Sequence, residues 1–279
     1  MTDVVLNLGG GVQSTTMLLM AARGELEPMP VLAVFADTGS EREATYAHLE
    51  FLQREVGERI EVVTTKRRAA GQSSGDLKLD VQRAAAGEIT SLSTPPVFAR
   101  RPDGRPGPTL RKCTRDYKIR PIEQELRRRG FGPDRPVEQW IGLSVDEVER
   151  MNRSGFPSWA TVRWPLIEKG MSRHDCELWL ERNGYYTPPK SACTFCPHHS
   201  DHAWRDLRDN SPAEWEEAVD VDRMVRNLPG LNGEAFLHRS MVPLDQVDLR
   251  SPEERGQLSL EAMAEWDAPP DECGGGCFT

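Results

Sequence analysis

The sequence predicts an α/β protein with a doubly wound parallel sheet. Apolar runs of strand length at residues 4–8, 31–35 and 60–64 alternate with helical patterns at 15–22 and 41–56, which is the β-α-β order of a parallel sheet. A glycine-rich turn follows the first run, and an Asp-Thr-Gly turn follows the second. Both turns are therefore expected at the carboxyl ends of strands, where open α/β sheets bind ligands.

The turn after the first strand leads directly into a helix. Its residues are Gly9, Gly10, Gly11, Val12, Gln13 and Ser14. Glycines let the backbone approach an anion, the N–H groups of the helix's first turn point toward it, and Ser14 adds a hydroxyl donor. The loop lacks both the Gly-Lys-Ser/Thr end of a Walker A motif and the Gly-x-Gly-x-x-Gly dinucleotide spacing. It predicts another kind of nucleotide phosphate loop, with a plain tight turn as the alternative.

The second strand ends in Asp37, Thr38 and Gly39. Asp37 is placed where a carboxylate can position magnesium or part of a nucleotide. The structural alternative is an N-cap of the following helix, made by Asp37 or Ser40.

The rest of the chain divides into segments of different composition. A fourth strand is expected at 139–143, within a nucleotide-binding domain of residues 1–144. Residues 66–112 are rich in Gly, Pro, Arg and Ser and predict a mobile lid beside the site. Amphipathic pieces predict a mostly helical region over 145–262, and residues 263–279 are expected to form a flexible tail.

Composition limits the function classes. The chain has 279 residues and a net charge of −9, so general electrostatic attraction to nucleic acid is not indicated. A basic stretch at 111–120 leaves a local contact open. No apolar run is long enough to span a bilayer and the N-terminus has no signal-peptide pattern, so a cytoplasmic protein with no membrane partner is expected.

Six cysteines favour metal or redox chemistry over a disulfide framework in a cytosolic protein. They are Cys113, Cys176, Cys193, Cys196, Cys273 and Cys277. The two-residue spacer between Cys193 and Cys196 lets both thiolates face one metal centre, and the proline that follows is typical of iron–sulfur ligation. A zinc site that uses neighbouring histidines is the alternative.

Several segments resemble, in the right order, the motifs of iron–sulfur APS reductases and of the PP-loop (adenine nucleotide α-hydrolase) superfamily, in its PAPS reductase-like branch. These segments are Gly9–Ser14, Asp37–Gly39, Cys113–Ile122, Gly142–Glu147, Pro165–Leu166, Ser172–Trp179, Cys193–Cys196 and Glu272–Gly274. The resemblance implies a Rossmann-like fold and an adenine nucleotide bound by the residues Gly9, Gly10, Gly11, Gln13, Ser14, Asp37, Thr38, Gly39 and Gly142.

The resemblance also implies a metal site. Thr114 stands where the reductases have a second adjacent cysteine, so the matching ligands are Cys113, Cys193 and Cys196, three thiolates for a [4Fe–4S] cluster. Related enzymes that thiolate tRNA use such three-cysteine clusters. Cys176 is either a fourth ligand or, as we favour, a buried structural thiol.

Two further departures bear on the reaction. The phosphate loop has Gly9 and Gln13 where the motif has Ser and Asp, and Ser144 and Val145 replace the paired arginines that are expected to clamp a sulfonucleotide. Serine and valine cannot hold an anion as arginine does. The departures favour an ATP-dependent sulfur-incorporation (thiolation) enzyme over a sulfonucleotide (APS/PAPS) reductase, and a zinc-stabilised nucleotide-binding module without catalysis is a third hypothesis.

In the favoured interpretation, ATP and Mg²⁺ adenylate an acceptor oxygen and pyrophosphate leaves. Lys118 would offset phosphate charge and Asp37 would position magnesium or the adenosine. Sulfide from the cluster, or a persulfide on Cys273 or Cys277 of the tail, would then displace AMP. Expected partners are a sulfur donor such as a cysteine desulfurase and an acceptor that is a small nucleobase, a nucleoside or a nucleic acid; a homodimer is also allowed.

Overall fold

The computed structural model describes most of the chain. The described ranges are residues 2–65, 74–89, 95–100, 106–109, 112–151, 156–228, 233–257 and 259–268. The chain forms two compact units, and each combines segments that are separate along the chain. The described residues of the sheet unit lie within Met1–Thr65 and Thr114–Ala192, and those of the cysteine unit lie within Lys66–Cys113 and Cys193–Gly275. This division differs from the expected boundary at 144, because the chain enters the cysteine unit twice.

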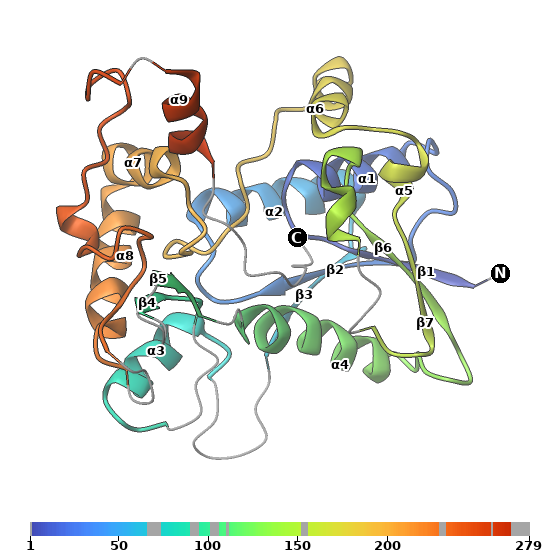
Figure 1. Ribbon diagram of the computed structural model, residues 1–279. Helices are drawn as coiled ribbons and strands as arrows, with labels where there is room; N and C mark the ends of the chain where they lie inside the picture. Colours follow the sequence, from blue (N-terminus) through green and yellow to red (C-terminus); the bar gives the residue numbers. More distant parts are fainter. Residues whose placement is uncertain are drawn as a thin grey trace. The chain divides into compact units, whose positions relative to one another are not determined.

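A parallel sheet lies at the centre of the sheet unit (Figure 1). Its described strands are β1 (Asp3–Asn7), β2 (Leu32–Asp37), β3 (Ile60–Thr64), β6 (Val137–Ile141) and β7 (Ala160–Arg163), in the order β3-β2-β1-β6-β7. All four neighbouring pairs are parallel. The four strands expected from the sequence are confirmed within a few residues, and β7 is an addition.

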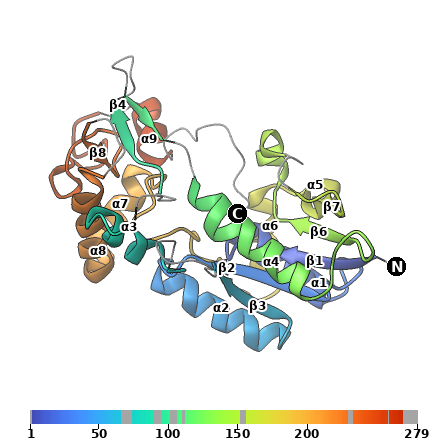
Figure 2. The same ribbon diagram turned by 90° about the horizontal axis from the view of Figure 1, so that it is seen from below.

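Helices cover both faces of this sheet, as a doubly wound fold requires. They are α1 (Val12–Ala22), α2 (Glu43–Val56), α4 (Arg120–Arg128), α5 (Pro165–Glu168) and α6 (Arg173–Arg182). Val4 and Leu6 of β1 belong to an apolar cluster with α1, α2 and α6, whereas Val5 between them packs in a second cluster with Leu126 of α4. In Figure 2, α4 accordingly lies in front of the strands. The α/β fold class predicted from the sequence is confirmed.

The described part of the cysteine unit is mostly helical. Its helices are α3 (Leu77–Ala85), α7 (Asp201–Asn210), α8 (Pro212–Val225) and α9 (Leu260–Asp267), and its short strands are β4 (Phe98–Arg100), β5 (Pro106–Pro108) and β8 (Ala235–Phe236). The strands form an antiparallel sheet in the order β5-β4-β8.

Two segment predictions need correction. Residues 66–112, expected as an irregular lid, contain α3, β4 and β5 where they are described, because β4 pairs with β8 and Leu77 and Val81 of α3 are buried. The expected tail from 263 begins inside α9 (Leu260–Asp267), and residues 269–279 lie outside the described part. Among the described residues, no helix has the length and apolar character needed to cross a membrane.

Candidate nucleotide site

A pocket lies at the carboxyl ends of β1, β2 and β6. Its lining residues are Asn7, Leu8, Gly9, Phe35, Ala36, Lys118, Ile122 and Ile141. The chain runs from β1 to β2 and β3 on one side, whereas β6 and β7 extend the sheet on the other. The pocket therefore marks the switch point at which doubly wound sheets bind ligands. Its volume of about 20 Å³ admits a water-sized group, so a nucleotide requires lining side chains to move.

Two hydrogen bonds within the glycine loop fix its conformation. Ser14 Oγ accepts the N–H of Gly9 at 3.2 Å and donates to the carbonyl oxygen of Gly11 at 3.3 Å. Gly10 has a φ of +77°, a left-handed conformation that glycine adopts without strain, and Gly11 is the N-cap of α1. The predicted turn is therefore present. The Ser14 hydroxyl is buried within it, and it would donate to a phosphate only by releasing Gly11.

Gly142 joins β6 to this loop. A Cβ at this position would stand 2.9 Å from the backbone nitrogen of Ser14, closer than real side chains come. Glycine is thus required here because two backbone segments approach each other, one after β6 and one at the start of α1. This contact fixes the glycine loop on the sheet.

Two of the residues that depart from the reductase motifs, Gln13 and Ser144, contact each other. Gln13 Nε2 donates to Glu147 Oε2 at 2.9 Å and lies 3.4 Å from Ser144 Oγ. The Ser144 hydroxyl donates in turn to Asp146 at 3.2 Å. The guanidinium group of Arg150 pairs with Glu147. Carboxylates rather than free guanidinium groups therefore stand beside Gln13.

Asp37 forms a turn at the end of β2. Its Oδ1 accepts the Gly39 N–H and the Tyr46 hydroxyl, both at 2.8 Å. Burial and the bond to Asp37 raise the pKa of Tyr46, so the phenol stays protonated and continues to donate. Arg42, rather than Asp37 or Ser40, is the N-cap of α2, which corrects the N-cap alternative.

Lys118 reaches the pocket from a π-helical turn, Thr114–Ile119, that precedes α4. Its ammonium lies 3.3 Å from Glu41 Oε1, and the Thr38 hydroxyl also donates to this oxygen at 3.3 Å. Glu41 is 5% exposed. The sequence analysis did not identify Glu41 as a site residue, although its position two residues after the Asp-Thr-Gly turn places it near the end of β2.

A buried histidine of α2 is hydrogen-bonded to the first turn of α1. His48 of α2 is 1% exposed, and its Nε2 lies 2.8 Å from Thr15 Oγ1. Its Nδ1 lies 2.7 Å from the Tyr186 hydroxyl. Burial lowers the pKa of His48 to about 4, so the imidazole is neutral at physiological pH. Sequence reasoning missed this contact because its members are far apart in the chain.

The cysteines occupy different surroundings. Cys193 and Cys196 share one turn, in which the Cys196 N–H donates to the Cys193 carbonyl oxygen at 3.0 Å. His199 Nε2 lies 3.1 Å from that same oxygen. Cys176 is fully buried in α6, and burial raises the pKa of its thiol to about 12. This environment agrees with a structural thiol.

The predicted iron–sulfur site is not tested by the described residues. Within the described ranges, no group of three or more His, Cys, Asp or Glu side chains is placed to hold a metal ion. A cluster held by Cys113, Cys193 and Cys196 therefore stays a prediction. Cys273 and Cys277 lie outside the described residues.

The chain was compared with known protein families, curated proteins and solved structures. No protein-family model matches the chain, and no curated protein matches it. Among solved structures, the chain is similar to phosphoadenylyl-sulfate (PAPS) reductase from Candida auris in its phosphate complex, with a TM-score of 0.41 and 13% sequence identity. The similarity covers 67% of this chain and 76% of that one. At these values it transfers neither an activity nor a residue role.

Proposed function

We propose that the chain is an ATP-dependent sulfur-incorporation enzyme, which adenylates an acceptor and then replaces the adenylated oxygen with sulfur. The observation that carries the proposal is the pocket at the switch point between β1 and β6, with Gly9 of the glycine loop and Lys118 in its lining. Glycine backbone and a helix N-terminus attract phosphate groups, and the lysine ammonium adds positive charge.

The proposed first step is attack by an acceptor oxygen on the α-phosphorus of MgATP. The bond from that phosphorus to the bridging oxygen breaks, and pyrophosphate leaves with the electron pair. Negative charge grows on the phosphoryl oxygens, where the Lys118 ammonium and the N-terminus of α1 would stabilise it. For Lys118 to do so, its contact with Glu41 at 3.3 Å must loosen when phosphate enters.

The charges beside the glycine loop favour this reaction over sulfonucleotide reduction. A reductase needs cationic groups for the sulfate or phosphate of its substrate. Here Ser144 and Val145 occupy the arginine positions, Glu147 is bonded to Gln13, and Arg150 is paired with Glu147. The surroundings of Gln13 therefore suit an acceptor that approaches with little negative charge.

In the second step, a sulfur nucleophile would displace AMP from the adenylated acceptor. A persulfide on Cys273 or Cys277, loaded by a sulfur donor such as a cysteine desulfurase, is the proposed source. Its outer sulfur bonds to the acceptor as AMP leaves, and the thiol of the other tail cysteine then breaks the S–S bond to the acceptor. The thiolated product is released, and the resulting Cys273–Cys277 disulfide is reduced by an external thiol. A low thiol pKa and access to solvent are needed for that role, and buried Cys176, with its raised pKa, lacks both. The proposed acceptor is a nucleobase, a nucleoside or a nucleic acid.

The test uses the full chain purified without oxygen and MgATP labelled at the α-phosphate. Bulk tRNA, DNA and a nucleoside mixture are offered separately as acceptors, with sulfide as the sulfur source because it can displace AMP directly, without a persulfide. We expect AMP and pyrophosphate in equal amounts, formed only with one acceptor, which gains sulfur by mass spectrometry. Lys118→Met should slow AMP release at least about tenfold, the scale of losing one charged contact to a transition state.

Lys169→Met is the matched control, because Lys169 is exposed after α5 and outside the pocket lining. It should leave AMP release unchanged. Formation of sulfite from APS or PAPS with a thiol and without ATP would establish the reductase instead. A chain that binds no ATP, or a Lys118→Met variant as active as the parent, would contradict the proposal.

A further inference from the structure

The cysteine unit contains a cavity of about 650 Å³ that the proposed function does not use. Residues at one side of its lining are Asp201, His238, Arg239 and Ser240. Asp201 opens α7, and the other three follow β8. The cavity therefore brings together an acid, an imidazole and a hydroxyl from segments almost forty residues apart.

These groups form one hydrogen-bonded chain. The Ser240 hydroxyl oxygen lies 2.7 Å from His238 Nδ1, and His238 Nε2 lies 3.1 Å from Asp201 Oδ1. The backbone N–H of Ser240 donates to the same Nδ1 at 3.1 Å. Since an N–H can only donate, Nδ1 is the unprotonated nitrogen of a neutral ring, and the proton is on Nε2.

This tautomer fixes the direction of both remaining bonds. The Ser240 hydroxyl must donate to Nδ1, and the Nε2–H must donate to the Asp201 carboxylate. A serine hydroxyl that donates to an imidazole, which a buried carboxylate orients in turn, is the arrangement that activates a nucleophile. It is recognised by geometry and roles rather than by order along the chain.

Asp201, the carboxylate at the end of this series of hydrogen bonds, is held in its ionised form. Asp201 is 8% exposed, and burial by itself raises a carboxyl pKa. Bonds from His238 and from Arg239, whose Nη2 lies 3.0 Å away, outweigh burial and hold the pKa of Asp201 below its usual value. Its place in the first turn of α7 also favours negative charge. An ionised Asp201 accepts the Nε2–H of His238 and so orients the imidazole.

Ser240 itself is accessible. Ser240 is an exposed residue, whereas His238 is only 4% exposed. The next residue, Met241, has a φ of +53°, a left-handed conformation that costs a non-glycine residue about 1 kcal/mol or more. The Met241 N–H donates to the His238 carbonyl oxygen at 3.0 Å, which closes a tight turn with Ser240 inside it.

The lining of the cavity suits a ligand with little net charge. Its ionised groups are Asp201, Asp248, Glu265, Arg239 and Arg255, and apolar surface comes from Val242, Val247, Ala262 and Trp266. The carboxylates and guanidinium groups nearly balance. A short acyl chain fits such a mixed lining better than a polyanion.

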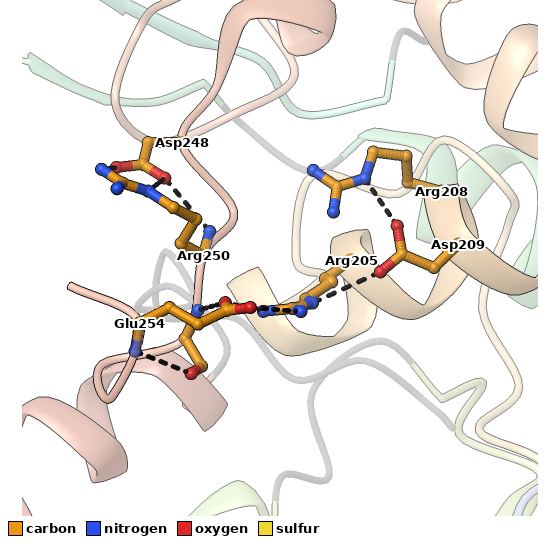
Figure 3. A network of polar contacts seen from close by, with 7 residues as sticks. Arg205, Arg208, Asp209, Asp248, Arg250 and Glu254 are labelled. Carbon is orange, nitrogen blue, oxygen red and sulfur yellow. Dashed lines mark hydrogen bonds and ion pairs between the residues drawn. The ribbon is translucent and has the colours of Figure 1, made fainter.

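Ion pairs anchor the segment that follows Val247 (Figure 3). Arg205 of α7 binds Glu254, with its Nη2 3.0 Å from Oε1, and Arg250 binds Asp248 at 2.8 Å. Asp248 and Arg255 of this segment belong to the cavity lining. The segment that follows Val247 is thus tied to the same helix that supplies Asp201.

We propose that Ser240 is the nucleophile of an acyl-transfer site in this cavity, with His238 as its general base, Asp201 as the positioning residue and a short-chain carboxylic ester as substrate. Ser240 Oγ attacks the ester carbonyl carbon while its proton passes to His238 Nδ1. The protonated imidazole then gives that proton to the departing alkoxide, which leaves an acyl-serine. Water hydrolyses the acyl-serine by the reverse transfers and releases the carboxylic acid.

The test is covalent labelling of the full chain with an alkyl fluorophosphonate, followed by peptide mass spectrometry. The phosphorus atom forms a bond to Ser240 Oγ and fluoride leaves, so no cofactor or ATP is needed. We expect one adduct, on Ser240, that Ser240→Ala abolishes. Asp201→Asn keeps the side chain's shape but favours the wrong tautomer of His238, and it should slow labelling at least about tenfold.

Ser251→Ala is the matched control, because Ser251 lies in the same unit but outside the cavity lining, and it should label at the parent rate. Circular dichroism establishes that each variant is folded before its rate is compared. A purely structural turn predicts no adduct on folded parent protein. That result, an adduct on another residue, or equal rates in folded Asp201→Asn and parent protein would overturn the proposal.

Discussion

In the sheet unit the most deeply buried strand residues are apolar, whereas the cysteine unit has a carboxylate among its most buried side chains. Val5, Leu6 and Val34 of the sheet are fully buried. In the cysteine unit Asp222 of α8 is 1% exposed, and it accepts the backbone N–H groups of Leu237 at 2.8 Å and of Leu244 at 3.1 Å.

The contrast follows from strand length. Strands of four to six residues in the sheet unit pair with each other along their edges, so backbone bonds hold them and apolar burial completes the unit. In the cysteine unit, β8 has only two residues, and the segment after it needs side-chain acceptors. We therefore expect the cysteine unit to depend on single polar residues to a greater degree than the sheet unit does.

The largest effect is expected from Asp222→Ala. Removing this carboxylate leaves two buried N–H groups without acceptors and the paired Arg226 without its partner. Breaking a buried pair costs about 3–5 kcal/mol. Urea unfolding followed by hydrogen exchange of peptides from α8 measures the loss. Asp220→Ala on the same helix is the control, because Asp220 pairs with Arg223 on the surface, and equal losses in the two variants would remove the contrast.

Acid should weaken the sheet unit first, through His48. Burial lowers the pKa of His48 to about 4, against about 6.5 in the unfolded chain. The unfolded state therefore takes up the proton first, and stability is lost as pH falls from 6.5 toward 4, by roughly 2–3 kcal/mol. Hydrogen exchange of α2 peptides between pH 7 and 4 measures it, and His48→Gln should remove this dependence.

The cysteine unit should respond to acid in a lower range. The bond to Arg205 lowers the pKa of Glu254 to about 2, so the stabilisation from this pair is present above pH 4.5 and is lost as pH falls toward 2. If both units lost protection over the same pH range, the assignment of the first transition to His48 would be wrong.

Gly142→Ala tests the packing of the glycine loop. The added Cβ would stand 2.9 Å from the Ser14 backbone nitrogen, and such overpacking costs about 1–3 kcal/mol. ATP binding, measured by titration calorimetry, should weaken with it because the loop must shift. Gly132→Ala is the control, since no described atom lies within 4 Å of its Cβ position; similar losses in the two variants would contradict this role of Gly142.

The smallest effect is expected from Arg205→Ala, which removes the exposed ion pairs of Arg205 with Asp209 and Glu254 (Figure 3). Exposed pairs contribute little and are screened by salt. The melting temperature should fall slightly at low salt and match that of the parent at 1 M salt. A large loss that persists in high salt would mean that this network is essential to the cysteine unit.

Local signals explain what the sequence predicted well. Apolar periodicity gave the strands β1, β2, β3 and β6, and glycine content gave the loop that ends at Ser14, because both depend on neighbouring residues. The capping box of α6, formed by Ser172 and Asp175, is equally local.

Long-range pairing explains what the sequence did not predict. The bond between Gln13 and Glu147 spans 134 residues. The pairing of Ala99 in β4 with Ala235 in β8 also joins segments that are far apart along the chain. No local pattern marks such partners, so residues 66–112 were expected to be irregular. β7 escaped prediction because Ala160–Arg163 is short and only half apolar.

The order of the strands also has a consequence for synthesis of the chain. Strand β1 lies between β2 and β6, and Asn7 of β1 bonds to Gln139 of β6 across 132 residues. At about 5–20 residues per second, the ribosome needs roughly 7–26 s to supply the second neighbour. During that interval β1 presents an unpaired apolar edge, which is the kind of surface that chaperones shield and that aggregation exploits.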